Sequence, residues 1–401
     1  MQRKRRTYKI ALIILILPLH LCGCWDYMDV EERGYVLGVA IDKSEEVILN
    51  DNNPEYMPLE ATGEVYDFTI QIPVISRSQS KPYGQSGASA EKPRHWNLTI
   101  RATTFFEANR QYATRTDYPP FYSHLQAIVL SEDAAKGDIG KLLDMFLRDP
   151  EMRRRTKVFI TPGKAKDVLE VIPKIDDYAS QYLAKITRNA YKTSRLLHRT
   201  DLGKLSEAMH AKSSFVLPRV IATEDEIKDA GCAVFDNNKM VGWLDEIKTK
   251  YLKWISGYAK GGIVTLNMPG KEQYPIVLEL RKLKTKQKPV VSGDSISMNL
   301  DIKAVMNIGE VSEVGFAHAE DDEYIHELEI VAEDLIKRQI ESTIDFVKEK
   351  YGCDVFFFGR SMRRYEPETW EKVKDNWNEV FQNVKVNVNV MVQIKQLGLI
   401  K

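Results

Sequence analysis

Strict alternation of apolar and polar residues in the last third of the chain constrains the fold most. Apolar side chains stand at every second position over residues 296–308 and again over residues 384–394. A period of two places one face of a strand in a core and the other in water. Between these runs, residues 325–351 carry an apolar stripe at helical spacing, with a single polar break at Gln339. We therefore expect a C-terminal α+β domain, residues 291–401, in which one long helix covers a largely antiparallel sheet.

The first 24 residues resemble an export signal that ends in a lipid attachment site. Five basic residues precede an apolar run over residues 10–17. That run is shorter than the roughly 20 residues needed to cross about 30 Å of hydrocarbon, so a processed signal peptide, residues 1–23, is favoured. Cys22, Gly23 and Cys24 follow Leu21 and resemble a bacterial lipobox, although Cys22 replaces the usual Ala, Ser or Thr.

The lipobox resemblance implies cleavage between Gly23 and Cys24. It also implies that Cys24 carries a covalent diacylglycerol and an N-acyl lipid, and several acyl chains together anchor a protein stably in a bilayer. We therefore expect the mature protein to be tethered by its first residue. The alternative is that Cys24 is an ordinary buried thiol or one half of a disulfide.

Composition limits the remaining function classes. The whole chain carries 57 basic and 57 acidic residues, and loss of the basic signal peptide leaves the mature chain mildly acidic. This balance gives no support for a nucleic-acid partner, which usually binds a basic face or a recognisable module. Cys232 and Cys353 are the only cysteines outside the lipobox. Two isolated cysteines predict buried thiols, with a single bridge between them as the alternative.

Residues 24–202 are predicted to form an N-terminal α+β domain, because strand patterns alternate with helical ones. Residues 34–42 are typical of a central strand, and residues 66–74 alternate as in a strand with one buried face. Residues 76–94 are rich in Ser, Gly, Gln, Lys and Pro and predict a mobile surface loop, either a plain hairpin insertion or a partner-binding loop. The four arginines in residues 148–155 either bind an anion or tie a helix end to its neighbours.

Residues 203–290 are predicted to form a small middle α+β domain. Asp201 is a good N-cap for its first helix. Two short apolar runs within residues 232–244 flank an Asp-Asn-Asn-Lys sequence, which tolerates a tight turn and predicts a β-hairpin. The helix that follows is expected to stop at Gly261 and Gly262.

Patterns that carry catalysis or metal binding are weak. His318 and His326 lie in an acidic stretch that is more typical of a solvated helix cap than of a metal site. Cys232 and Cys353 lack a neighbouring histidine or basic helix start that would activate a thiolate. No serine stands in a nucleophile-elbow context, and the Gly-Lys pair at Gly163 lacks the P-loop spacing. We therefore predict a protein that is not an enzyme, with no metal site and no cofactor besides the lipid.

Several quoted stretches together resemble one known family. They are the lipobox followed by CWD, the VLGVAID strand, the block SHLQAIVLSEDAAKGDIGKLLDMFLRDPEMRRR, and the closing Trp and Gly-Leu elements. In this order they resemble the Ger(x)C family, the lipoprotein C subunits of spore germinant receptors, over essentially the whole chain. The resemblance implies three mixed α/β domains, no known catalytic residues, and a place on the outer face of the spore inner membrane beside two integral-membrane subunits.

The expected function is that of a membrane-tethered receptor subunit. The alternative is a solute-binding lipoprotein of a membrane transporter, which would usually show two α/β lobes with repeated βαβ units. A cell-wall enzyme would need an acid/base or metal constellation, which the sequence does not show. The expected partners are A- and B-type integral-membrane subunits and the membrane itself, and no residue pattern indicates direct contact with a nutrient.

Overall fold

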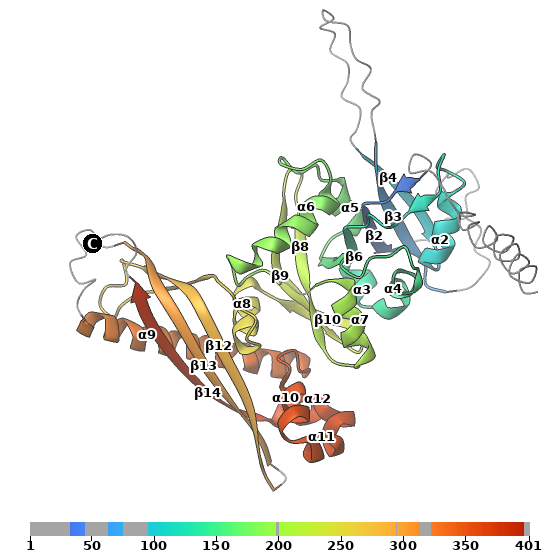
Figure 1. Cartoon of the computed structure of the whole chain (residues 1–401). Coiled ribbons are helices and arrows are strands. Elements are labelled where there is room, and N and C mark those ends of the chain that lie inside the picture. Colours follow the sequence, from blue (N-terminus) through green and yellow to red (C-terminus); the bar gives the residue numbers. More distant parts are fainter. Residues whose placement is uncertain are drawn as a thin grey trace, which may run out of the picture.

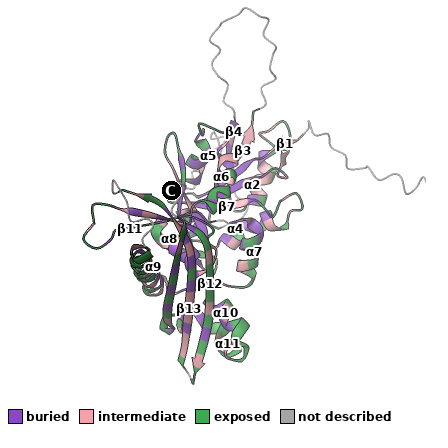
Figure 2. Ribbon diagram, turned by 60° about the vertical axis from the view of Figure 1, so that its left-hand side comes forward, coloured by how far each residue is buried: buried purple, intermediate pink, exposed green. Residues whose placement is uncertain are grey.

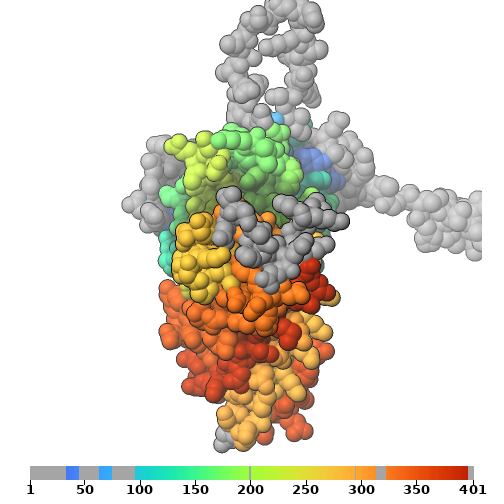
Figure 3. Space-filling model, turned by 90° about the vertical axis from the view of Figure 1, so that its left-hand side faces the viewer, coloured from blue at the N-terminus to red at the C-terminus, as the bar shows by residue number. Residues whose placement is uncertain are grey.

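The computed structural model describes residues 33–44, 63–74, 95–197, 200–293, 295–312 and 322–396. The predicted lipid site, the loop at residues 76–94 and His318 lie outside these ranges. The described chain forms an eight-stranded sheet and a four-stranded sheet, each with its own helices, and a separate two-stranded pair (Figure 1). Seen from the side in Figure 3, the N-terminal part lies above the C-terminal part. The mixed α/β fold expected from the sequence is confirmed.

The N-terminal sheet has the strand order β10-β9-β8-β7-β6-β2-β3-β4. β2, β6, β7 and β8 pair in parallel, and the other neighbours pair antiparallel. The strands are β2 (Gly38–Lys43), β3 (Tyr66–Pro73), β4 (His95–Ala102), β6 (Ala127–Ser131), β7 (Lys157–Thr161), β8 (Phe215–Ala222), β9 (Ile227–Asp236) and β10 (Lys239–Leu244). The separate pair is β1 (Gly34–Tyr35) with β5 (Pro120–Phe121).

Helices cover both faces of this sheet. The helices are α2 (Phe105–Tyr112), α3 (Glu132–Ala135), α4 (Ile139–Arg148), α5 (Ala165–Glu170), α6 (Ala179–Ile186), the 3₁₀ helix η3 (Thr187–Tyr191) and α7 (Leu202–His210). The prediction that β3 has one wet face is therefore wrong. Gln71, on the face expected to be exposed, is fully buried and bonds to the Leu169 carbonyl and the Ser180 hydroxyl. Helix coverage, which strand periodicity does not reveal, closes that face.

Local signals in the sequence placed several element ends correctly. Asp201 accepts a hydrogen bond from the Lys204 backbone N–H at 3.0 Å and caps α7. Asn237 and Asn238, with φ values of 46° and 64°, form the tight turn between β9 and β10. Both residues occupy the left-handed region that asparagine tolerates, so the predicted hairpin is confirmed.

The C-terminal sheet has the order β11-β12-β13-β14. Its strands are β11 (Ile263–Leu266), β12 (Ile276–Ser292), β13 (Ser295–Val311) and β14 (Lys385–Gln396). β12 and β13 form a long antiparallel hairpin, and β14 joins β13 in parallel after a crossover. The helix α9 (Asp322–Tyr351) packs on one face of the sheet and is exposed along its outer side (Figure 2). The long helix over a largely antiparallel sheet is thus confirmed.

The segment predicted as a middle domain does not have a core of its own among the described residues. Ala233 and Phe235 of β9 belong to the N-terminal core, whereas Cys232 and Val234 on the other face belong to the core of the C-terminal sheet. The helix α8 (Glu246–Ile255) also packs into that second core. β8 to β10 extend the N-terminal sheet, so the domain boundary predicted after residue 202 is corrected. The boundary predicted after residue 290 is corrected as well, because it falls within β12.

The glycine stop predicted for α8 is also corrected. Gly257, with φ of +72°, follows the last turn, so α8 ends before Gly261. Gly261 serves a different purpose, because a Cβ there would lie 2.0 Å from the Tyr191 carbonyl oxygen. Ser194 donates a hydrogen bond to the Gly261 carbonyl, which ties this loop to the N-terminal part.

Three short helices follow α9 and pack at the lower end of the sheet in Figure 1. They are α10 (Phe358–Tyr365), α11 (Pro367–Val373) and α12 (Trp377–Asn383), with the 3₁₀ turn η5 (Lys374–Asn376) before the last. Trp377 is buried and meets the half-buried Trp370 edge to face, with ring centroids 5.4 Å apart. Trp377 belongs to the core of the C-terminal sheet, and Trp370 packs against that core. Among the described residues, no helix combines the length and apolarity needed to cross a membrane.

Candidate functional site

The sequence-predicted site, Gly23 with Cys24, lies outside the described residues, so its lipidation stays a prediction. The other two cysteines lie within them. Cys232 and Cys353 are buried and form no disulfide with each other or with any other described residue, which confirms the predicted buried thiols. Burial raises the pKa of each thiol to about 12, because the thiolate would lose its hydration. Neither sulfur is therefore a nucleophile at neutral pH.

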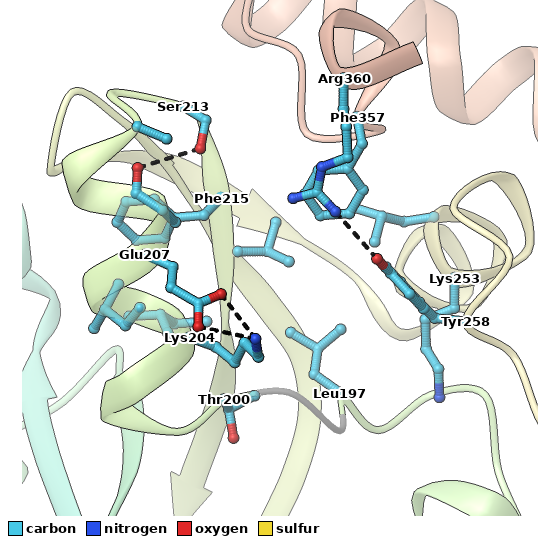
Figure 4. A pocket seen from close by; sticks show the side chains of 16 residues that line it. Leu197, Thr200, Lys204, Glu207, Ser213, Phe215, Lys253, Tyr258, Phe357 and Arg360 are labelled. Carbon is cyan, nitrogen blue, oxygen red and sulfur yellow. Dashed lines mark hydrogen bonds and ion pairs between the residues drawn. The ribbon is translucent and has the colours of Figure 1, made fainter. Parts of the chain in front are cut away.

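Two adjoining cavities of the described chain lie where the N-terminal sheet meets the helices of the C-terminal part. We call them together the junction groove. One cavity of about 200 Å³ lies between α7, β8, α8 and the start of α10, and the second, of about 810 Å³, continues toward α11 and α12. Both are lined by Ser213, Phe357 and Arg360. In Figure 4, Phe357 and Arg360 face α7 and β8 across the opening.

One wall of the junction groove is a cluster of aromatic and cationic groups. The Arg360 guanidinium lies 4.6 Å from the Phe357 ring centroid, in cation–π geometry. The Phe357 ring meets Tyr258 edge to face, with centroids 5.9 Å apart. Arg360 also donates to the Tyr258 hydroxyl at 3.5 Å. This wall therefore joins the loop after α8 to the first turn of α10.

Phe357 has a left-handed backbone, with φ of +66°, just before α10. This conformation is unusual for an aromatic residue and costs on the order of 1–3 kcal/mol, so the surroundings must hold it. The neighbouring Asp354 does so. One carboxylate oxygen of Asp354 accepts from the backbone N–H groups of Phe356 and Phe358, at 3.0 and 3.2 Å.

The second Asp354 oxygen completes the anchor. It accepts from the Gly359 backbone N–H at 2.7 Å and from the Trp377 indole N–H at 2.9 Å. Burial raises the pKa of the Asp354 carboxyl, while these hydrogen bonds to the ionised form oppose that rise. Asp354 thus fixes the start of α10 and its position against α12.

The opposite wall carries charges that are already paired. Lys204 and Glu207, one turn apart on α7, form an ion pair at 2.7 Å. Both side chains are about half exposed, so water screens the pair and its contribution to stability is small. The wall is otherwise formed by apolar side chains such as Phe215 and Leu205. The groove therefore offers an apolar floor between an arginine on one side and a neutralised pair on the other.

Lys253 of α8 also lines the groove, although its ammonium is directed into the protein. The side chain is 2% exposed and donates to the carbonyls of Leu196 and Thr193, at 2.6 and 3.3 Å. Burial lowers the pKa of Lys253 to about 8, and the charge of Asp229 opposes this shift. Asp229 on β9 is buried, neither carboxylate oxygen has a hydrogen-bond partner among the described residues, and burial raises its pKa to about 8.

These arrangements are suited to binding and to holding the two halves together. Among the described residues, no group of three or more His, Cys, Asp and Glu side chains is placed to hold a metal ion. Arg148 pairs with Asp144 at 2.8 Å, and Arg154 donates to the Gly203 carbonyl at 3.3 Å. Two of the four arginines for which anion binding was one alternative therefore make structural contacts.

Asp354, Phe357 and Asp229 do not stand out in the sequence as site residues. A signal was present for Asp354, because an aspartate four residues before a Phe-Gly pair resembles a side-chain cap at a chain turn. Asp229 gave no such signal, because burial of a strand residue on a polar position depends on the helices packed above it. Only the tertiary packing shows that Asp229 is buried.

Comparison with known proteins adds a family to this geometry. The model described as Spore germination protein N-terminal domain matches residues 26–222, and the model described as Spore germination B3/GerAC like, C-terminal, matches residues 230–398. The two matches together span most of the chain. The chain belongs to the Ger(x)C family of spore germination proteins. This membership confirms the resemblance seen in the sequence.

Relatives in Bacillus subtilis (strain 168) match along nearly their full length. The chain is 29% identical to Spore germination protein YndF, with 99% of this chain and 98% of that protein covered. It is 26% identical to Spore germination protein B3, with 97% of each chain covered. It is 27% identical to Spore germination protein A3, with 96% of this chain and 97% of that protein covered.

A solved structure shares the fold of this Ger(x)C chain. The crystal structure of the GerBC protein matches with a TM-score of 0.58 and 24% sequence identity. The match covers 82% of this chain and 94% of the GerBC chain. The two proteins therefore share the overall fold.

Proposed function

We propose that this protein is the membrane-tethered lipoprotein subunit of a nutrient germinant receptor. The observation that carries the proposal is similarity over 96% or more of the chain to germination proteins B3 and A3, combined with a lipobox-like sequence that ends at Cys24. The proposed location is the outer face of the spore inner membrane. The proposed partners are the integral-membrane A- and B-type subunits of the same receptor.

The proposed role is assembly and positioning rather than catalysis. The buried thiols and the internally paired charges of the junction groove support this assignment. A lipid on the first mature residue confines the protein to two dimensions beside its partners, and this raises their effective concentration, so that modest contacts suffice for assembly. The first described strand begins ten residues after Cys24, so an extended connection spans at most about 35 Å. A lipid on Cys24 would therefore keep the N-terminal part of the protein near the membrane.

The partners are tested by extracting spore membranes in mild detergent and identifying the proteins that co-purify with this chain. Two multi-spanning subunits are expected. Recovery of an ATP-driven permease instead would favour the alternative, a solute-binding lipoprotein of a transporter, and would contradict the receptor assignment.

The tether is tested by Cys24→Ala, with Cys22→Ala, on the signal-peptide side of the cleavage site, as the matched control. The first variant is expected to lose the incorporated lipid label and the membrane fraction, because it lacks the acylated sulfur. The control is expected to keep both. Retention of the label and of membrane association by the Cys24 variant would contradict the proposed anchor.

A further inference from the structure

One face of the C-terminal sheet carries an unusual run of lysines. Four of them occupy alternate positions on β12, at Lys282, Lys284, Lys286 and Lys288. Alternate residues of a strand point to the same side and lie about 7 Å apart, so the four form a row about 20 Å long. All four are exposed. The opposite side of the sheet packs on α9 and forms the core.

Neighbouring strands extend this row into a surface. Lys303 of β13 pairs directly with Lys284, and Lys385 and Lys395 lie on the same exposed side of β14. We call these seven lysines the basic face. Within the described part of the chain, none of them takes part in an ion pair. In Figure 1, no labelled element lies over the side of β12–β14 that faces the viewer.

Few acidic groups of the described strands offset the basic face. Asp301 lies opposite Lys286, where its carboxylate accepts a hydrogen bond from Asn389 at 3.3 Å. Glu279 lies beyond the end of the lysine row and is paired with Arg281 at 3.4 Å. Glu310 is farther along, opposite Val277. A chain with no net charge overall therefore concentrates positive charge on one side of one sheet.

The basic face is an exposed surface spread over three strands, which favours a broad anionic surface as its partner. The two cavities of the junction groove, and a third beside Lys43 and Lys141, are lined by other residues. The lysines carry compact point charges on flexible stems and need no fixed partner geometry, whereas the rigid arginine fork matches one carboxylate or phosphate bidentately. Exposed Met391, at 49%, lies opposite Lys303 and adds an apolar group among the charges.

We propose that the basic face binds the anionic headgroups of a phospholipid bilayer. The inference deepens the proposed function and relies on it for one point, the lipid tether that keeps the protein beside such a membrane. Clusters of lysines near an anionic leaflet each contribute favourably to binding, and the attraction decays within a Debye length. A second attachment of this kind would lay the C-terminal sheet against the membrane, leaving α9 on the far side.

The test uses the mature polypeptide without its lipid, residues 25–401, which contains every described element. Binding is measured by co-sedimentation with vesicles of phosphatidylcholine alone and of phosphatidylcholine with about 30% phosphatidylglycerol. The wild-type chain is expected to bind the anionic vesicles and not the neutral ones. It should dissociate from the anionic vesicles as the salt concentration is raised to about 0.5 M, where screening is strong.

A fourfold variant, K282Q, K284Q, K286Q and K288Q, should weaken binding to the anionic vesicles by about 100-fold or more. The matched control, K164Q, K239Q, K337Q and K372Q, removes the same charge from exposed positions elsewhere and should bind like the wild type. Circular dichroism checks the fold of each variant. The paired variant K282Q with K286Q gives the same test with a smaller change, should the fourfold one fail to fold.

Equal binding by the fourfold variant and the wild type would overturn the proposal, as would failure of the wild type to bind anionic vesicles. Binding to an acidic polypeptide in place of vesicles would assign the face to a protein partner and would also refute the lipid proposal. None of these results depends on the receptor assignment, which the co-purification experiment tests separately.

Discussion

Asp229 allows a direct test of what it costs this fold to bury a carboxyl group. The carboxyl lies on β9, is 6% exposed, and has no hydrogen-bond partner for either oxygen within the described chain. Burial raises its pKa from 3.8 to about 8, because the ionised form would lose water without gaining a donor. The substitution Asp229→Asn imitates the protonated acid in size and removes the ionisation. We expect the variant to be more stable than the wild type at neutral pH.

The sign follows from linkage between protonation and folding. Well below pH 3.8, the Asp229 carboxyl is protonated in both the folded and the unfolded chain and contributes no pH dependence. As the pH rises toward 8, the unfolded chain releases the proton while the folded protein keeps it, so the free energy of unfolding falls. Between 3.8 and 7 this amounts to about 4 kcal/mol at most, and local relaxation reduces it to about 2–4 kcal/mol. Asp229→Asn should remove that decline.

Lys253 affects the pH dependence of the free energy of unfolding on the alkaline side. Its pKa is lowered from 10.5 to about 8, so the folded protein gains stability as the pH rises through that window. The wild-type free energy of unfolding should therefore pass through a minimum near pH 8. Asp229→Asn should remove the fall in the free energy of unfolding below pH 8 and leave the rise above pH 8.

The measurement is urea unfolding of residues 25–401, followed by tryptophan fluorescence at pH values from about 5 to 10. Asp225→Asn is the control, because Asp225 lies on the exposed turn before β9 and its side chain is 74% accessible. The control should keep the wild-type slope. If Asp229→Asn keeps the same slope as well, the reasoning about its buried carboxyl is refuted.

Three further predictions concern the packing of the junction and of the thiols. Asp354→Ala should lower the free energy of unfolding by about 2–4 kcal/mol, because three backbone N–H groups and the Trp377 indole lose their acceptor. Urea unfolding of the variant that matches the wild type would contradict this. Gly261→Ala should cost about 2 kcal/mol or more in thermal or urea unfolding, since its Cβ would meet the Tyr191 carbonyl, whereas Gly163→Ala, where a Cβ would meet no described atom, should have little effect. Iodoacetamide should leave Cys232 and Cys353 unmodified in the folded mature chain and modify both in urea, as mass spectrometry would show; rapid labelling of the folded protein would disprove their burial.

Periodicity predicted the elements where one face meets a core and the other meets water. The runs that became β13 and β14 alternate strictly, and the stripe of α9 faces them, so hydrophobic burial on one side selects these structures. Local chemistry likewise predicted the Asp201 cap and the Asn237–Asn238 turn, because both depend on groups within a few residues.

Periodicity failed where both sides of an element are covered. Gln71 looked like a solvent-facing residue of β3, but α5 and α6 close over it and supply its hydrogen-bond partners. The prediction of a separate middle domain failed for a related reason, because β9 contributes alternate residues to two cores. A single strand pattern does not state which neighbour will cover each face.

By itself, the sequence determined the family, the alternating strands, the long helix and a lipobox-like signal, because each is written in the order or spacing of nearby residues. Only the tertiary structure decided that β8 to β10 extend the first sheet, that Asp354 anchors α10, and that Asp229 is buried with no hydrogen-bond partner among the described residues. It also decided that four alternate lysines of β12 and three lysines of β13 and β14 share one face of the sheet. These features depend on which distant segments pack together, and free energy of burial over the whole chain, rather than local propensity, settles that choice.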